Sequence, residues 1–336
     1  MKNLRRLSIL LLFYLVILRA GEYADAFLEM GVSARALAMG NCSGTLDNTE
    51  TAFLSNPAGL GNIMRTRLGL MYASQFGLAN HNYAGLALPV KPGMTLAVSW
   101  IRFGVDDIPI RPDIIRTVAD KEQRRDSIVT LANTHLKTFN DAENALFVSI
   151  GKFNSGIMDL GWRYSKFRVD FPIGVNFKLI HKRLYNLEGY GLGLDVGGRI
   201  RVHGEELFDI SNLGFLSLGL ALKDITGTTI YWNTRRQDQI RMTPAAAFAL
   251  EQPLNRWRSK LNFAVEKDYR YAEKARYGLE IIYAERIACR FGLKNTGLTT
   301  GFGLNFKVMK KIVQVDYSFY NHDLGISHRL GSSIVF

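Results

Sequence analysis

The sequence is poor in cysteine and proline, with 2 Cys and 8 Pro among 336 residues. Two cysteines cannot supply the disulfide framework that stabilises many small exported domains. The sequence also contains no phosphate-binding loop of the Gly-x-x-x-x-Gly-Lys type, no paired-histidine metal motif and no nucleophile elbow. We therefore predict no catalytic residue, no cofactor site and no metal site, and we expect the protein not to be an enzyme.

Long apolar runs are also missing beyond residue 20, which excludes a further membrane-spanning helix of about 20 residues. The one apolar run, residues 7–18, follows a basic start and precedes the small residues Ala20 and Gly21. This arrangement is typical of a secretory signal peptide, which we assign to residues 1–20. Ala24 and Ala26 offer an alternative cleavage point. A membrane anchor helix is the alternative interpretation, but the run is too short to favour it.

The formal net charge is +12, and removal of Lys2, Arg5, Arg6 and Arg19 with the signal peptide would lower it to +8. A basic protein often binds nucleic acid, but an exported chain does not ordinarily meet it. Outer-membrane lipid and lipopolysaccharide are the expected counter-charges. A scattered basic surface with no specific ligand is the simplest interpretation.

Strand-like alternation dominates the chain from about residue 67 onward, in keeping with 31 Gly, 20 Phe and 14 Tyr. Ile173, Val175 and Phe177, for example, alternate with small or polar neighbours. Soluble sandwiches and membrane barrels both show this pattern. Three features favour the barrel: segments of about 9–11 residues, full charges on the polar face in mid-strand, and connections that alternate between short and long. We predict an all-β fold, a transmembrane antiparallel β-barrel.

Fourteen strands are expected, an even number that leaves both ends of the chain on one side of the membrane. The expected strands cover residues 67–75, 82–89, 94–102, 144–151, 171–184, 190–201, 214–223, 243–251, 259–267, 275–284, 286–294, 298–308, 311–319 and 326–336. Residues 152–170 contain further strand-like material around Trp162 and Tyr164, which could extend strands or add a pair. A short helix is expected within residues 113–133 of a long outer loop. The chain stops at Phe336, an aromatic residue on the last strand, which is typical of the signal that the barrel-assembly machinery reads.

The segment before the barrel does not alternate. The run from Phe27 to Gly40, followed by Asn56-Pro57-Ala58-Gly59-Leu60, resembles the PorV/PorQ family of outer-membrane proteins. These proteins are similar in fold to the FadL long-chain fatty-acid transporters. Further likeness lies at residues 174–178, 193–197, 106–109 and 232–234, so that the resemblance spans most of the mature chain.

The resemblance implies a fourteen-stranded barrel with residues 21–63 folded inside as a plug and residues 64–336 forming the wall. The small residues of the segment and the turn at Asn56-Pro57 agree with a plug, and a flexible periplasmic extension is the alternative. The resemblance also implies a cell outer membrane of the Gram-negative type. It suggests an accessory or shuttle role in type IX protein secretion, with secreted cargo proteins as partners. A FadL-like transporter of hydrophobic small molecules is the second interpretation, and a structural protein without cargo is the third.

Charged side chains on the inward face are the best candidates for function. Glu280 and Arg290 lie symmetrically about the turn at residues 284–286, so that we expect them to be cross-strand neighbours. Lys178 and Asp195 lie on strands that should be adjacent. We favour ion pairs that hold plug and wall together, and a polar path for a solute is the alternative. Cys42 should lie in the plug and Cys289 should face lipid, so that both are predicted to be unpaired.

Overall fold

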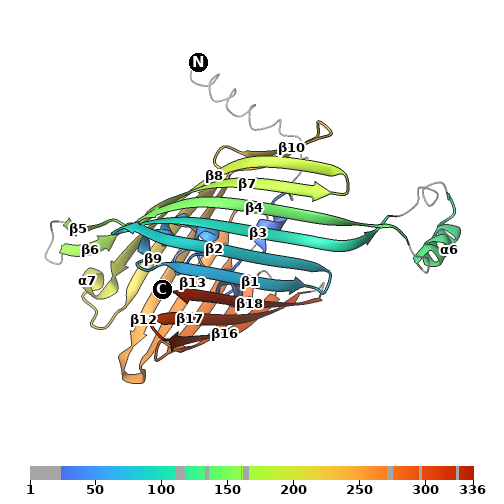
Figure 1. The fold of residues 1–336 in the computed structure, drawn as a ribbon. Coiled ribbons are helices and arrows are strands. Elements are labelled where there is room, and N and C mark those ends of the chain that lie inside the picture. The colour runs from blue at the N-terminus through green and yellow to red at the C-terminus, as the bar shows by residue number, and fades with distance from the viewer. Residues whose placement is uncertain are drawn as a thin grey trace, which may run out of the picture.

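The computed structural model describes residues 24–110, 118–132, 136–159, 161, 166–270, 275–294, 297–322 and 325–336. Within these residues fourteen antiparallel strands form a closed wall, because β1 pairs with both β2 and β18 (Figure 1). The wall strands are β1 (Arg67–Gln75), β2 (Ala79–Lys91), β3 (Met94–Pro109), β4 (Thr138–Lys152), β7 (Ile173–Leu184), β8 (Leu187–His203), β9 (Phe215–Lys223), β12 (Thr243–Leu254), β13 (Ser259–Asp268), β14 (Arg276–Tyr283), β15 (Ile287–Lys294), β16 (Gly297–Val308), β17 (Lys311–His322) and β18 (Gly325–Val335). The predicted barrel class and its fourteen wall strands are confirmed.

Two strands are much longer than the sequence pattern predicts. β3 continues seven residues past position 102, and β4 begins six residues before position 144. The two extensions pair with each other, as at Ile108↔Phe139. Alternation does not reveal these extensions, because both of their faces carry polar side chains and the hydrophobic period is lost. They form an arm whose tip carries α6 (Lys121–Ala132) (Figure 1). The helix expected in residues 113–133 therefore exists in its second half, and residues 113–117 lie outside the described residues.

Four short strands supplement the wall. β5 (Ser155–Asp159) and β6 (Lys166–Asp170) form a hairpin in the segment where an added pair was one expectation, and Val169 of β6 pairs with Val202 of β8. Trp162 and Tyr164 lie outside the described residues. β10 (Thr228–Trp232) and β11 (Gln237–Ile240) form a second hairpin whose first strand pairs with β8. Neither β10 nor β11 was predicted.

We call the end where β1 begins and β18 ends the terminal end, and the opposite end the loop end. The expected rhythm of short turns at one end and long loops at the other is wrong at both ends. At the loop end, only three residues separate β1 from β2 and only two separate β7 from β8. The β5–β6 hairpin and the connection that carries α7 (Gly204–Phe208) are long, yet both lie at the terminal end with the short turns. The remaining short helix of the wall is η2 (Asn255–Trp257), also at a terminal-end turn. In the described part of the chain, no helix has the length and hydropathy to cross a bilayer.

The two faces of the wall have opposite character, as the alternation predicts. Outward side chains are apolar and exposed, for example Phe177 at 58% and Leu192 at 73%. Inward positions next to them, such as Lys178 and Asp195, are buried although they are charged. The buried charges show that the interior is filled rather than open to water.

Residues 24–63 occupy that interior, whereas Met64 is 91% exposed. They contain α2 (Ala26–Glu29), α3 (Ala34–Ala38), α4 (Ala52–Ser55) and η1 (Pro57–Asn62). Helix α3 contacts β15 to β18, whereas η1 contacts β3, β4, β7 and β8 on the other side of the barrel. A segment that touches opposite walls lies inside the barrel, and we call residues 24–63, the described part of the expected segment, the plug.

The plug lies against glycines of the wall. A Cβ atom on Gly174 of β7 would overlap the backbone of Pro57, and one on Gly292 of β15 would overlap the backbone of Gly40. Glycine at these positions lets plug and wall approach to backbone contact. These inward glycines are therefore needed so that the plug backbone can dock against the wall.

Gly174→Val is expected to displace η1 while leaving the barrel closed, because the added side chain occupies the space of Pro57. Overpacking of this kind costs about 1–3 kcal/mol, so the melting temperature in detergent should fall. Protease should also cleave the plug faster than in the parent protein. Gly198→Val on β8 is the matched control, since a Cβ atom there meets no atom within 4 Å. Equal melting of the two variants would contradict the close approach.

Candidate functional site

The plug motif Asn56-Pro57-Ala58-Gly59-Leu60 forms the start of η1. The Asn56 side chain accepts a hydrogen bond from the Ala58 N–H at 3.1 Å and donates to the Gly198 carbonyl of β8 at 3.1 Å. The first bond caps the helix, and Pro57 at the first helical position needs no N–H partner. Ala58 and Leu60 are completely buried. The motif therefore fastens one end of the plug to the wall.

Glu280 of β14 is the centre of an ion-pair cluster that joins plug to wall. Its register partner is Arg290 of β15, whose Nε lies 2.7 Å from Glu280 Oε1. Arg35 of the plug helix α3 approaches the same carboxylate with two nitrogens, at 2.9 Å and 2.6 Å. Arg290 also contacts Asp316 of β17 at 2.7 Å. The expected cross-strand pair thus exists, and it continues into the plug through Arg35.

Lys178 and Asp195 are also brought together, with 2.9 Å between Nζ and Oδ1. Lys178 has a second carboxylate partner, Asp224, at 2.7 Å. Asp224 lies where the chain leaves β9 and turns toward β10, and it is completely buried. Asn176, next to Asp195, donates to the Phe53 carbonyl of the plug at 2.7 Å. This cluster too connects the wall to the plug.

A third group of charges holds the start of the plug near the loop end. Asp25 and Glu29 of the plug face Arg270 and Arg276 on either side of the β13–β14 connection. Lys223 at the end of β9 lies 3.9 Å from Glu29. The ion pairs between plug and wall therefore begin at the first described residues of the plug. They extend to Glu50, which pairs with Arg67 of β1 at 2.8 Å.

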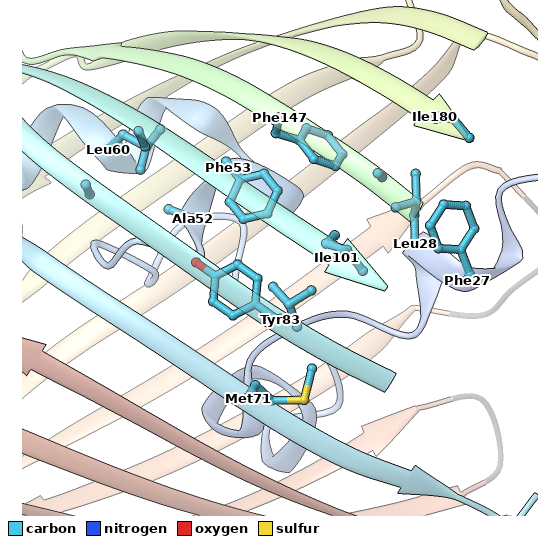
Figure 2. Packing of buried hydrophobic residues seen from close by; sticks show 14 of the residues in the cluster. Phe27, Leu28, Ala52, Phe53, Leu60, Met71, Tyr83, Ile101, Phe147 and Ile180 are labelled. Atoms are coloured by element: carbon cyan, nitrogen blue, oxygen red, sulfur yellow. The ribbon is translucent and has the colours of Figure 1, made fainter. Parts of the chain in front are cut away.

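Another part of the plug packs against an apolar stripe of the wall, which we call the seam. Phe53 of α4 lies 4.8 Å from the Phe147 ring and 6.0 Å from the Tyr83 ring, centroid to centroid. Figure 2 shows these rings between Leu60 at one end and Phe27, Leu28 and Ile180 at the other. The plug side of the seam consists of Ala24, Phe27, Leu28, Val32, Ala52, Phe53, Leu60 and Ile63, and the wall side of Met71, Ala73, Tyr83, Ala87, Ala97, Ile101, Ala145, Phe147, Ile180, Ile230 and Ile240.

Open space along the plug is small. A cavity of about 40 Å³ lies between α2, the following turn and the wall, with Glu29, Lys223, Glu266 and Arg276 among its lining residues. A water molecule has a share of about 30 Å³ in the liquid, so this space holds water and no larger solute. A larger hollow of about 560 Å³ lies away from the plug among the turns of the terminal end, with Lys260, Ile282 and Asn305 among its lining residues.

Sequence reasoning found the wall members of the ion pairs and missed their partners. Arg35 lies in a segment without alternation, and Asp224 follows a strand end, so that no periodicity marks either as inward-facing. The seam was missed because inward residues such as Ile101, Phe147 and Ile180 were expected to be polar. Adjacent apolar residues on both faces, as in Leu146-Phe147-Val148, were the available signal.

The remaining predicted positions are placed as follows. Phe336 follows β18, its N–H donates to the Thr66 carbonyl at 3.0 Å, and Lys311 lies over its ring at 4.2 Å. Cys42 is buried in the plug and Cys289 is exposed on β15, and both are free thiols. Among the described residues no group of three or more potential metal ligands comes together.

Glu280→Gln is expected to destabilise the protein strongly, because Arg35 loses its carboxylate partner in an enclosed site. Removal of one partner from a buried pair costs about 3–5 kcal/mol. Asp159→Asn is the control, since its pair with Lys166 is exposed and such pairs contribute at most about 1 kcal/mol. Both can be followed as melting in detergent. A Glu280→Gln protein that melts like the control would refute the ion-pair role.

Comparison with known proteins gives only distant likenesses. No protein-family model matches the chain, and no curated protein matches it. The Ralstonia pickettii toluene transporter TbuX is 9% identical, over 91% of this chain and 97% of that chain, with a TM-score of 0.46. A mutant of the TodX monoaromatic hydrocarbon channel is 12% identical, over 90% of this chain and 97% of that chain, with a TM-score of 0.47. A Pseudomonas aeruginosa FadL homologue is 11% identical, over 90% of this chain and 97% of that chain, with a TM-score of 0.35. Likenesses of this strength carry no argument about function, and membership of the PorV/PorQ family stays a prediction.

Proposed function

We propose that the protein is a non-enzymatic barrel of the outer membrane that lets small hydrophobic molecules pass along the seam between plug and wall. The single observation that carries this proposal is the apolar inner lining. A water-filled pore has a polar interior, whereas here Ile101, Phe147 and Ile180 face inward and are at most 1% exposed. Apolar wall residues at these positions would stabilise an apolar solute once the plug side chains withdraw.

The two sides of the plug differ in how they could separate from the wall. On the ionic side, separation would leave buried charges without partners, which is very unfavourable. On the seam side, an apolar solute could replace the contacts of Phe27 and Phe53 with contacts of the same kind. Movement of the plug is therefore easiest along the seam, and an apolar solute lowers its free-energy cost. The seam is also continuous, from Ile63 toward the terminal end to Phe27 and Ile180 toward the loop end.

Ile180→Gln is expected to slow the entry of an apolar dye such as N-phenylnaphthylamine into cells that carry the protein. A buried amide without a partner costs several kcal/mol and interrupts the seam where a solute would enter. Leu179→Gln is the matched control on the neighbouring residue, which is 41% exposed on the outward face. Dye entry should fall several-fold in the first variant only. Unchanged entry in both variants would reject the seam as the path.

A second candidate function is the accessory role in type IX secretion. The arm formed by β3, β4 and α6 supports it, because the arm extends beyond the barrel wall at the loop end (Figure 1). Helix α6 carries charges of both signs, such as Lys121, Glu122 and Arg125, and lies away from the plug. Such a charged projection suits contact with another protein better than contact with an apolar solute.

The tip of the arm can be replaced without disturbing the paired strands, since the Ile110 N–H donates to the Lys137 carbonyl at 2.8 Å just below it. Replacement of residues 111–136 by a Gly-Ser link should leave melting and dye entry unchanged. If the second candidate is correct, exported proteins that crosslink to the parent protein should no longer be recovered with this variant. Recovery of the same crosslinked proteins with and without residues 111–136 would reject a role for the tip of the arm.

A further inference from the structure

The outward face of the wall changes abruptly from apolar to polar along one register line. Trp100, Leu146 and Leu179 are cross-strand neighbours on β3, β4 and β7, and each is 39% to 41% exposed. Two residues further toward the loop end, the corresponding outward neighbours are Arg102, Asn144 and His181. The apolar row ends the surface that hydrocarbon can cover, so that the polar row lies at the level of lipid headgroups.

We propose that this boundary is a binding site for a phosphorylated glycolipid of the lipid A type in the outer leaflet. The site, which we call the Arg102 patch, consists of Asn82, Arg102, Asn144, His181 and Arg183. Register places Arg102 between Asn82 and Asn144, and places His181 on the far side of Asn144. Arg183 lies two residues beyond His181 on the same face of β7.

Both guanidinium groups of the patch are available to an anion. Arg102 and Arg183 are exposed, and among the described residues neither has a carboxylate within ion-pair distance. Inward neighbours behave differently, since Lys182 on the other face of β7 pairs with Glu143 at 2.5 Å. Glu188 is the register partner of Arg183, but it accepts a hydrogen bond from Tyr190 at 3.4 Å. Guanidinium groups bind phosphate through two parallel hydrogen bonds.

The space between the two arginines is kept free by short side chains. Gly104 and Ala142, which are register partners, occupy the row beyond Arg102 and Asn144, and Ala142 pairs in turn with Arg183. No long side chain of this row therefore covers the guanidinium groups. A phosphate can be approached by Arg102 from below and by Arg183 from the side.

Neutral polar groups surround the arginines, and these suit sugar hydroxyls. Asn82 and Asn144 flank Arg102, and each is only partly covered. His181 stacks on Tyr190 with ring centroids 4.6 Å apart, and its Nε2 is buried, so that this ring borders the patch without offering Nε2 to a ligand. Amides beside two cations match a phosphorylated sugar, and the apolar rows below match its acyl chains. A simple phospholipid headgroup would use the cations but leave most of the neutral groups without partners.

The inference uses the outer-membrane location proposed above, but not the passage of hydrophobic molecules. Intact-complex mass spectrometry of the purified full chain in mild detergent can measure affinity for three added probes: diphosphoryl lipid A, dephosphorylated lipid A and phosphatidylglycerol. The parent protein should bind diphosphoryl lipid A about tenfold more tightly than dephosphorylated lipid A, since each cation near a lipid surface contributes about 1 kcal/mol. It should also bind diphosphoryl lipid A more tightly than phosphatidylglycerol, because phosphatidylglycerol offers only one phosphate to the two arginines and no sugar to the amides.

The double variant Arg102→Gln/Arg183→Gln should lose this preference, so that the three probes bind alike. Lys152→Gln is the matched control, because Lys152 lies on the outward face of β4 at the terminal end and should leave the preference intact. Dye entry through the seam should be unaffected in the double variant, which separates failure of this proposal from failure of the proposed function. Equal binding of the three probes by the parent protein would overturn the glycolipid assignment. A preference that survives in the double variant would overturn the Arg102 patch.

Discussion

Glu280 lies between two guanidinium groups, one from the wall and one from the plug, and the rest of the interior depends on this kind of pairing. A charge enclosed at membrane depth has little water to solvate it, so that it needs a partner within hydrogen-bond distance. The wall supplies more inward charge than its own neighbours neutralise. Arg35, Asp25 and Glu29 of the plug supply additional partners. The plug is therefore a part of the folded barrel, since its removal would leave the wall with unpaired charges.

The need to pair every enclosed charge gives the plug two kinds of contact with the wall, ion pairs and the apolar seam, and these differ in how easily they separate. Ion pairs have short, directional contacts that are lost within a small displacement, whereas apolar contacts along the seam can be exchanged for others without a large penalty. The Asn56 cap fixes the plug to β8, and the Glu280 cluster fixes it to the wall on the other side of the barrel. The side chains of Phe27 and Phe53 can withdraw from the seam while both anchors hold. A plug that pivots in this way opens a path along the wall rather than through the centre of the barrel.

Much of this architecture could be predicted from the sequence. A period-2 pattern fixes which side chains face lipid, and therefore also which charges face inward, so that Lys178, Asp195, Glu280 and Arg290 could be chosen correctly as inward residues. Register about a short turn was enough to pair Glu280 with Arg290. The partners from the plug could not be found, because contact between Arg35 and Glu280 spans 245 positions and leaves no local pattern. The long arm was missed because its strands carry polar side chains on both faces. The β10–β11 hairpin was missed because its strands are only five and four residues long, although Ile230 and Ile240 contribute to the seam.

Strands β3, β4 and β7 carry both proposed sites, the seam on their inward face and the Arg102 patch on their outward face. Ile101 faces the seam while Arg102 faces the headgroup level, and Ile180 and His181 repeat the relation on β7. A shift of one residue in strand register would exchange the two faces and place Arg102 in the apolar interior. Contacts of η1 with Gly151 of β4 and Gly174 of β7 oppose such a shift, because only glycine fits beneath the plug backbone at those positions. Plug docking therefore fixes the register that the outward surface requires, although the plug never touches that surface.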